Sequence, residues 1–161
     1  MRIFDFAILA CWLSCGSALF AGPVAERDGW IVMPTDMPFE TLVTAVKTAT
    51  KANGMGVVTE AGPTAMAASR GITIPGNRVI GVFNNDFAVN VLATSTAAMI
   101  EAPIRFYVTE SPDGTSTLSY KTPSHVFAPY ADEGGEDLSD LAAMLDQRFA
   151  AIADAAVMSS H

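Results

Sequence analysis

Four side chains of this sequence can exchange protons with a substrate and fall near the predicted ends of strands: Glu60, Glu101, Tyr120 and His125. Carboxyl groups act as a general acid and base when different environments separate their pKa values, and histidine titrates near neutral pH. One hypothesis is therefore a small hydrolase or isomerase using Glu60 or Glu101 with Tyr120 and His125. It requires that these side chains converge in one pocket.

Two further residues, Asn84 and Arg105, complete the set of candidate ligand-binding residues. Asn84 stands at a predicted strand-to-helix turn, where free backbone donors can bind an anion, although capping the helix is the simpler interpretation. Arg105 lies within a strand that should be half-buried. We expect it to pair with an acid such as Glu101 or Glu60, or to receive a carboxylate ligand.

The sequence holds no legible catalytic or metal-binding motif, so we assign no catalytic residue and expect no metal and no cofactor. Solvated acids and an ordinary surface histidine explain the candidates above without any chemistry. A single well-placed histidine is too few for a typical metal site. The acidic stretch 132–140 lacks the spacing of a calcium loop. A haem or metal carrier is a third hypothesis, which no motif supports.

Residues 1–21 have the pattern of a secretory signal peptide: Arg2 precedes an apolar stretch that ends in small residues. Cleavage after Ala21 or Ala18 would fit. An uncleaved anchor and a lipid on Cys11 or Cys15 stay open as alternatives. We expect a periplasmic or secreted protein without a membrane span in its mature form. Since both cysteines lie in this segment, the mature chain would have no disulfide and no thiol chemistry.

The charge balance excludes one class of partner. The chain has 161 residues, a formal net charge of −8 and a pI near 4.5. Because phosphate backbones are bound by basic surfaces, we expect no nucleic acid partner. The length allows one domain, which we place at residues 29–158 after a linker at 22–28.

Hydrophobic periodicity predicts the elements of the first half of the domain. Strands are predicted at residues 29–33, 55–60 and 78–83, the last being apolar almost throughout and hence central in a sheet. Helices are predicted from Pro38, at the first turn, to a stop at Gly54, over residues 63–69, and over residues 87–94.

In the second half, residues 104–109 and 117–120 alternate as strands, and residues 112–114 join them as a hairpin turn. Residues 132–137 are predicted to form an acidic loop. A final helix should follow, with one apolar stripe made of Leu138, Leu141, Leu145, Phe149, Ile152 and Ala156.

The order of elements, β-α-β-α-β-α-β-β-α, predicts an α+β fold. We expect a single mixed or antiparallel sheet of about five strands with helices packed mainly on one face, because each helix has only one apolar stripe. The other face of the sheet would be left partly uncovered. A homodimer would cover it.

Several short segments have the order and spacing of a known family: 39–41, 54–57, 79–84, 101–104 and 120–123. On these segments the chain, from Trp30 to about Tyr130, resembles the domain of unknown function 302 family. The family has a histidine soon after the second strand, where this chain has residues 60–63 without one, and of its Gly-Asn-Pro segment only Asn84 is kept. The resemblance implies the fold and a homodimer but no reaction.

From these observations we expect a non-catalytic homodimeric binding or interaction module of the cell envelope. Its partner would be an unidentified small ligand or another envelope protein. The alternative is the small hydrolase or isomerase described above.

Overall fold

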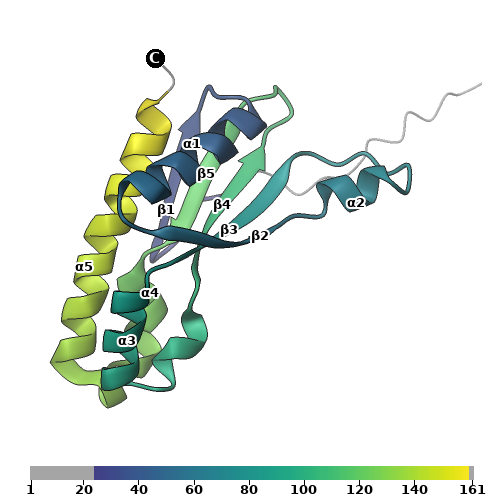
Figure 1. The fold of residues 1–161 in the computed structure, drawn as a ribbon. Coiled ribbons are helices and arrows are strands. Elements are labelled where there is room, and N and C mark those ends of the chain that lie inside the picture. The colour runs from purple at the N-terminus through teal and green to yellow at the C-terminus, as the bar shows by residue number, and fades with distance from the viewer. Residues whose placement is uncertain (1–23, 160–161) are drawn as a thin grey trace, which may run out of the picture.

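The computed structural model describes residues 24–159 of the chain (Figure 1). Five strands form one sheet in the order β1-β5-β4-β3-β2, and all neighbouring strands are antiparallel. The strands are β1 (Trp30–Thr35), β2 (Gly56–Ala61), β3 (Asn77–Phe83), β4 (Ile104–Glu110) and β5 (Ser116–Lys121). The predicted α+β fold with a single sheet is therefore confirmed. The segment interpreted as a signal peptide, residues 1–21, lies outside the described residues.

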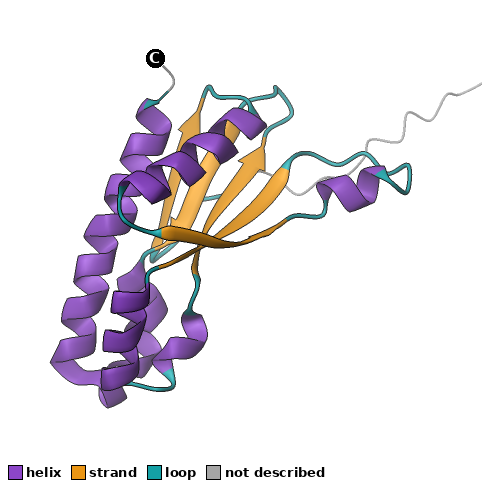
Figure 2. Ribbon diagram, viewed as in Figure 1, coloured by secondary structure: helices purple, strands orange, loops and turns teal. Residues whose placement is uncertain are grey.

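Helices cover one face of this sheet (Figure 2). Helix α5 packs against α1, α3 and α4, and α1 in turn packs on β3, β4 and β5. Helix α2 lies on an arm that projects from the sheet between β2 and β3 (Figure 1). The helices are α1 (Phe39–Ala52), α2 (Thr64–Ala68), α3 (Asn85–Thr94), α4 (Pro123–Phe127) and α5 (Ala131–Met158), with short 3₁₀ turns η1 (Ala98–Glu101) and η2 (Ala128–Tyr130).

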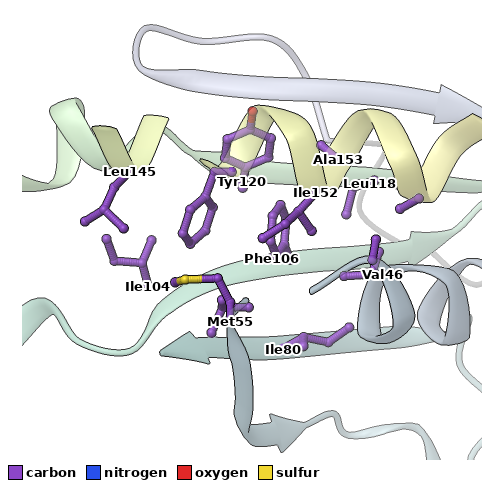
Figure 3. Packing of buried hydrophobic residues seen from close by; sticks show 14 of the residues in the cluster. Val46, Met55, Ile80, Ile104, Phe106, Leu118, Tyr120, Leu145, Ile152 and Ala153 are labelled. Carbon is purple, nitrogen blue, oxygen red and sulfur yellow. The ribbon is translucent and has the colours of Figure 1, made fainter. Parts of the chain in front are cut away.

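The core lies between the sheet and the helices α1 and α5 (Figure 3). The predicted alternation places Ile104, Phe106 and Val108 of β4 on the helix side, where all three are buried. At its centre the ring of Phe106 stacks on Phe149 of α5 with centroids 4.8 Å apart, and it meets Tyr120 of β5 edge-on at 5.1 Å. Aromatic packing thus joins the middle of the sheet to the longest helix.

Both long helices bury the faces that their periodicity predicted. In α1 the buried stripe includes Phe39, Leu42 and Val46. Pro38 occupies the N-cap rather than the first helical position, because its backbone is extended there (φ −60°, ψ 150°). In α5 the predicted stripe is buried except for Leu141, which is partly exposed.

The hairpin predicted between residues 104 and 120 is also confirmed. Strands β4 and β5 pair in register from Phe106↔Tyr120 to Glu110↔Ser116. In the turn, Oδ1 of Asp113 accepts hydrogen bonds from the backbone N–H of Thr115 at 3.0 Å and from its hydroxyl at 2.7 Å. An aspartate side chain that binds the backbone two residues on is the usual chemistry of such turns.

The prediction of an acidic loop over residues 132–137 is wrong. These residues belong to the first turns of α5, and only Gly135 departs from helical geometry (φ 60°, ψ −150°). Acidic side chains such as Asp132 and Glu133 suit the amino end of a helix, because they complement its dipole. The glycine therefore marks a kink in the helix rather than a loop.

Two smaller expectations also need adjustment. Strand β3 is internal, but the centre of the sheet is β4. The turn at α4 was not predicted: the hydroxyl of Thr122 accepts the backbone N–H of His125 at 3.3 Å, and Pro123 follows at the first turn. Within residues 24–159 we find no helix whose length and hydropathy suit a bilayer crossing.

Candidate functional site

The strand register places a second set of side chains on the face of the sheet opposite the helices. Tyr107 pairs with Val79 on one side and with Ser119 on the other, and Trp30 pairs with Lys121. In β4 these positions alternate with residues buried against the helices, and antiparallel partners share a face of the sheet, so the side chains of this set point away from the helix layer. We call this surface the open face; its residues are Trp30, Val32, Asn77, Val79, Gly81, Arg105, Tyr107, Thr109, Ser119 and Lys121.

A hollow of about 520 Å³ lies on the open face. Its volume falls within the range of small-molecule sites, about 300–1,000 Å³. Apolar, aromatic and charged groups all contribute to its lining. The residues that line this open-face hollow are Trp30, Asn77, Val79, Glu101, Ile104, Arg105, Tyr107, Tyr120, Lys121 and Val126.

Cations gather at this hollow although the chain as a whole is acidic. Of the nine Lys and Arg residues of the sequence, Arg2 lies outside the described range, which leaves eight. Three of these eight lie in or beside the hollow: Arg105 and Lys121 line it, and the Arg27 guanidinium is 5.0 Å from the Trp30 ring centroid. The Lys121 ammonium is 5.6 Å from the same centroid. Both distances allow cation–π attraction.

Arg105 differs from its prediction. It is exposed rather than half-buried, and within residues 24–159 its guanidinium has neither an ion pair nor a hydrogen bond. The two acids expected to pair with it have other partners, because Glu60 binds Lys47 and Arg78 while Glu101 binds Tyr130. Strand alternation turns Arg105 away from the helix layer, which is the physical reason for its exposure.

Two hydrogen bonds fix polar groups at the hollow. The Tyr130 hydroxyl donates to the Glu101 carboxylate at 2.7 Å, and this bond raises the pKa of Tyr130 above its usual value. Nδ2 of Asn77 donates to the hydroxyl oxygen of Tyr107. The Tyr107 ring therefore has a defined position on the open face.

Glu60 lies at the far edge of the sheet and on the helix side. It pairs with Ile80 in the register, so its side chain points towards α1. There it accepts a hydrogen bond from Lys47 at 2.7 Å and another from Arg78, which also contacts Glu40 at 3.3 Å. The hydrogen bond from Lys47, followed by that from Arg78, lowers the pKa of Glu60. Glu60 is thus a partner in an ion-pair network that joins α1 to the sheet.

Asn84 caps a helix. Its Oδ1 accepts the backbone N–H groups of Asp86 at 2.9 Å and Phe87 at 3.2 Å, and its Nδ2 donates to the carbonyl of Gly54 at 3.0 Å. The side chain uses both ends to join α3 to the turn before β2. The structural role that the sequence suggested for this turn is the one observed.

Tyr120 borders the open-face hollow, but its ring points the other way. The side chain is 4% exposed and packs against Phe106 and Phe149 on the helix side (Figure 3). Burial, with smaller contributions from Asp154 and Asp146 of α5, raises the pKa of Tyr120 to about 12. A phenol with that pKa is a poor proton donor at neutral pH.

His125 lies on α4 and is exposed. Its ring packs on Gly29, where a Cβ would lie 2.1 Å from the ring. Gly29 has a positive φ of 72°, and its carbonyl accepts the backbone N–H of Thr122 at 2.9 Å. The histidine thus helps to hold the segment before β1 against α4, and it is absent from the lining of the hollow.

The structure brings three of the six candidate residues to one place and leaves three elsewhere. Glu101, Arg105 and Tyr120 border the open-face hollow, whereas Glu60, Asn84 and His125 do not. Glu60 on β2 and Tyr120 on β5 are separated by two intervening strands. The version of the hydrolase or isomerase hypothesis that uses Glu60 therefore lacks its convergence, and in the version that uses Glu101 the third residue, His125, is absent from the lining of the hollow. In the range 24–159, no three His, Cys, Asp or Glu side chains are grouped as metal ligands.

Sequence reasoning missed several residues of the hollow, chiefly Trp30, Tyr107 and Lys121. The sequence held evidence for Tyr107, because the alternation of residues 104–109 places Arg105 and Tyr107 on one face of the strand. What could not be read was the pairing of β1 with β5, which brings Trp30 beside Lys121.

Comparison with known proteins gives a consistent result. The chain is similar to a crystal structure of an uncharacterised conserved DUF302 protein from Bacillus stearothermophilus, with a TM-score of 0.70 and 18% sequence identity. The similarity covers 80% of this chain and 98% of that one, and at this identity it shows the fold. No curated protein matches. The family model "Domain of unknown function DUF302" matches residues 31–156, and the chain therefore belongs to the DUF302 family.

Proposed function

We propose that this chain is a non-catalytic, homodimeric binding module of the cell envelope and that the open-face hollow holds its small ligand. The observation that carries the proposal is the hollow itself, about 520 Å³ in volume and lined by aromatic, apolar and cationic side chains. Ligand sites have this composition: a mostly apolar lining with a few polar groups that fix orientation. The candidate acids and bases are spread over both faces of the sheet, which favours binding over catalysis.

The envelope location is supported by the pattern of residues 1–21, a basic start followed by an apolar stretch with small residues at its end. An exported chain whose two cysteines lie in the removed segment would depend on its core for stability. The continuous cluster of buried residues between the sheet and α1 and α5 meets that need.

The homodimer is supported by the edge of the sheet at β2. An edge strand presents unpaired backbone groups that can pair with a second chain. Three large apolar side chains on β2 and on the arm after it are exposed: Val58 at 52%, Met66 at 67% and Ile72 at 49%. A second copy related by a two-fold axis would bury the same side chains on both protomers.

Native mass spectrometry of the protein purified from its own envelope tests these statements together. We expect a dimer of chains that lack residues 1–21 and retain a small molecule. Met66→Asp should shift the protein to the monomer, whereas Val89→Asp, which changes an exposed apolar residue on α3, should not. Val79→Glu should release the ligand, and Thr48→Glu on the exposed side of α1 should not. A ligand-free monomer at micromolar concentration would contradict the proposal.

A further inference from the structure

We infer that the ligand of the open-face hollow is a small organic anion, a carboxylate on an apolar or aromatic body, bound by Arg105 and Lys121. The inference rests on the proposed function, because it names the chemical class of the ligand for the same hollow. It follows from three features of the hollow: two cations without acidic partners, a planar guanidinium among them, and an apolar lining.

Arg105 and Lys121 lie on neighbouring strands and on the same face. The β4–β5 pairing ends at Phe106↔Tyr120, and each of the two cations is the next residue outward from that pair. Like charges at opposed positions of a sheet repel each other. Among residues 24–159 the ion pairs join Lys47 and Arg78 to acids, and none involves Arg105 or Lys121. An anion bound between the two cations would relieve this repulsion.

The one carboxylate among the described residues that line the hollow, Glu101, does not pair with either cation. Glu101 is engaged by the Tyr130 hydroxyl at 2.7 Å, and no nitrogen of Arg105 or Lys121 lies within the 4.0 Å of an ion pair with it. The hollow therefore has two cations against one carboxylate, in a chain with 17 acidic and 9 basic residues. This local excess of positive charge is opposite in sign to the net charge of the protein.

The shape and lining of the hollow define the rest of the ligand. The guanidinium of Arg105 can bind a carboxylate through two parallel N–H donors, whereas the ammonium of Lys121 acts as a point charge. Around them lie Trp30, Val79 and Tyr107, whose side chains can cover an apolar body. The Tyr107 ring is fixed by its bond to Asn77, so this wall exists before the ligand arrives.

A fluorescence titration of the chain without residues 1–21 tests the inference. Trp30 is its only tryptophan, because the sequence has two and Trp12 lies in the removed segment. The probes are 4-phenylbutyrate, its neutral counterpart 4-phenylbutyramide, and inorganic phosphate. We expect saturable binding of the carboxylate. The amide should bind at least about tenfold more weakly, since hydrogen bonds to a charged group contribute about 1.5–3 kcal/mol.

Variants then assign the effect to the two cations. Arg105→Gln and Lys121→Gln should each weaken 4-phenylbutyrate binding about tenfold, and Arg105→Lys should restore only part of the loss because it lacks the planar fork. The matched controls Arg70→Gln and Lys51→Gln change exposed cations on α2's arm and at the end of α1, and should leave the affinity unchanged. Circular dichroism checks that each variant is folded.

Three results would overturn the inference. Equal affinity for the carboxylate and the amide would remove the anion from the ligand class while leaving the hollow as a binding site. Binding of phosphate more tightly than of 4-phenylbutyrate would remove the apolar body. Absence of binding by all probes would reject this ligand class, and the proposed function would then be decided separately by the molecule retained in native mass spectrometry.

Discussion

Gly81 allows a sharp test of the packing at the open face. It is buried in β3, with Thr59 of β2 and Arg105 of β4 as its two cross-strand partners. A Cβ added at this position would lie 2.1 Å from Oγ1 of Thr59 and 2.9 Å from Cγ of Pro103. Both distances are shorter than the contacts that a Cβ atom makes in proteins. We therefore expect Gly81→Ala to destabilise the fold.

The magnitude follows from two opposing effects. Forcing an extra methyl group into a packed site costs about 1–3 kcal/mol. Replacing glycine also restricts the unfolded chain, which stabilises the folded state by about 0.4–1 kcal/mol. The net loss of unfolding free energy should therefore be about 1–2 kcal/mol, measured as a lower urea midpoint at an unchanged slope.

A double-mutant cycle identifies the contact responsible. Thr59→Ala removes Oγ1 and leaves the contact with Pro103, so it should recover part of the stability lost in Gly81→Ala, with a coupling energy of at least about 0.5 kcal/mol. Gly56→Ala is the matched control, because its Cβ would come no closer than 3.5 Å to Phe83. Strict additivity of the two substitutions, or full stability of Gly81→Ala, would refute the reasoning.

Four further outcomes are expected from the contacts described. Phe106→Ala should lower the unfolding free energy by about 3–5 kcal/mol in urea titrations, because the ring is fully buried between two others; a loss below 1 kcal/mol would contradict this. Asn84→Ala should cost about 0.5–2 kcal/mol through the lost cap of α3, whereas the exposed neighbour substitution N85A should cost less. The pKa of Glu60 is lowered from 4.5, so its stabilising effect is complete above pH 4.5 and disappears as the pH falls through the lowered pKa. Glu60→Gln should therefore flatten the acid limb of a stability-against-pH profile, and an unchanged limb would argue against the network. The pKa of Tyr120 is raised to about 12, so the stability it provides is complete below pH 10 and is lost as the pH rises through 12. Ultraviolet titration should detect an ionisation near pH 12, and this ionisation should be absent from Tyr120→Phe.

Much of the fold was predictable because its signals are local. The spacing of Leu42 and Val46 predicted α1, the alternation of residues 104–109 predicted β4, and the turn chemistry of Asp113 predicted the hairpin. Each of these patterns depends on residues a few positions apart, which share a helix face or a strand face wherever the element lies. The kink at Gly135 was misjudged as a loop, since acidic residues with glycine are compatible with either a loop or a helix start.

The candidate site was predicted only in part. The sequence identified Glu101, Arg105 and Tyr120, which border one hollow, but grouped them with Glu60 and His125, which lie elsewhere. The residue types were informative about chemistry, and their distances along the chain said nothing of their distances in space.

The amino-acid sequence alone determined most of the elements, the family resemblance and the acidic charge, because these depend on residue type and short-range periodicity. The tertiary structure decided the strand order β1-β5-β4-β3-β2, and with it the neighbours of every exposed side chain. That order places the three strands with buried apolar faces, β5, β4 and β3, together at the middle of the sheet and against the helices, which is a property of the whole core. Only then does Trp30, which is far away in the chain, meet Arg105 and Lys121 of the β4–β5 hairpin at one hollow.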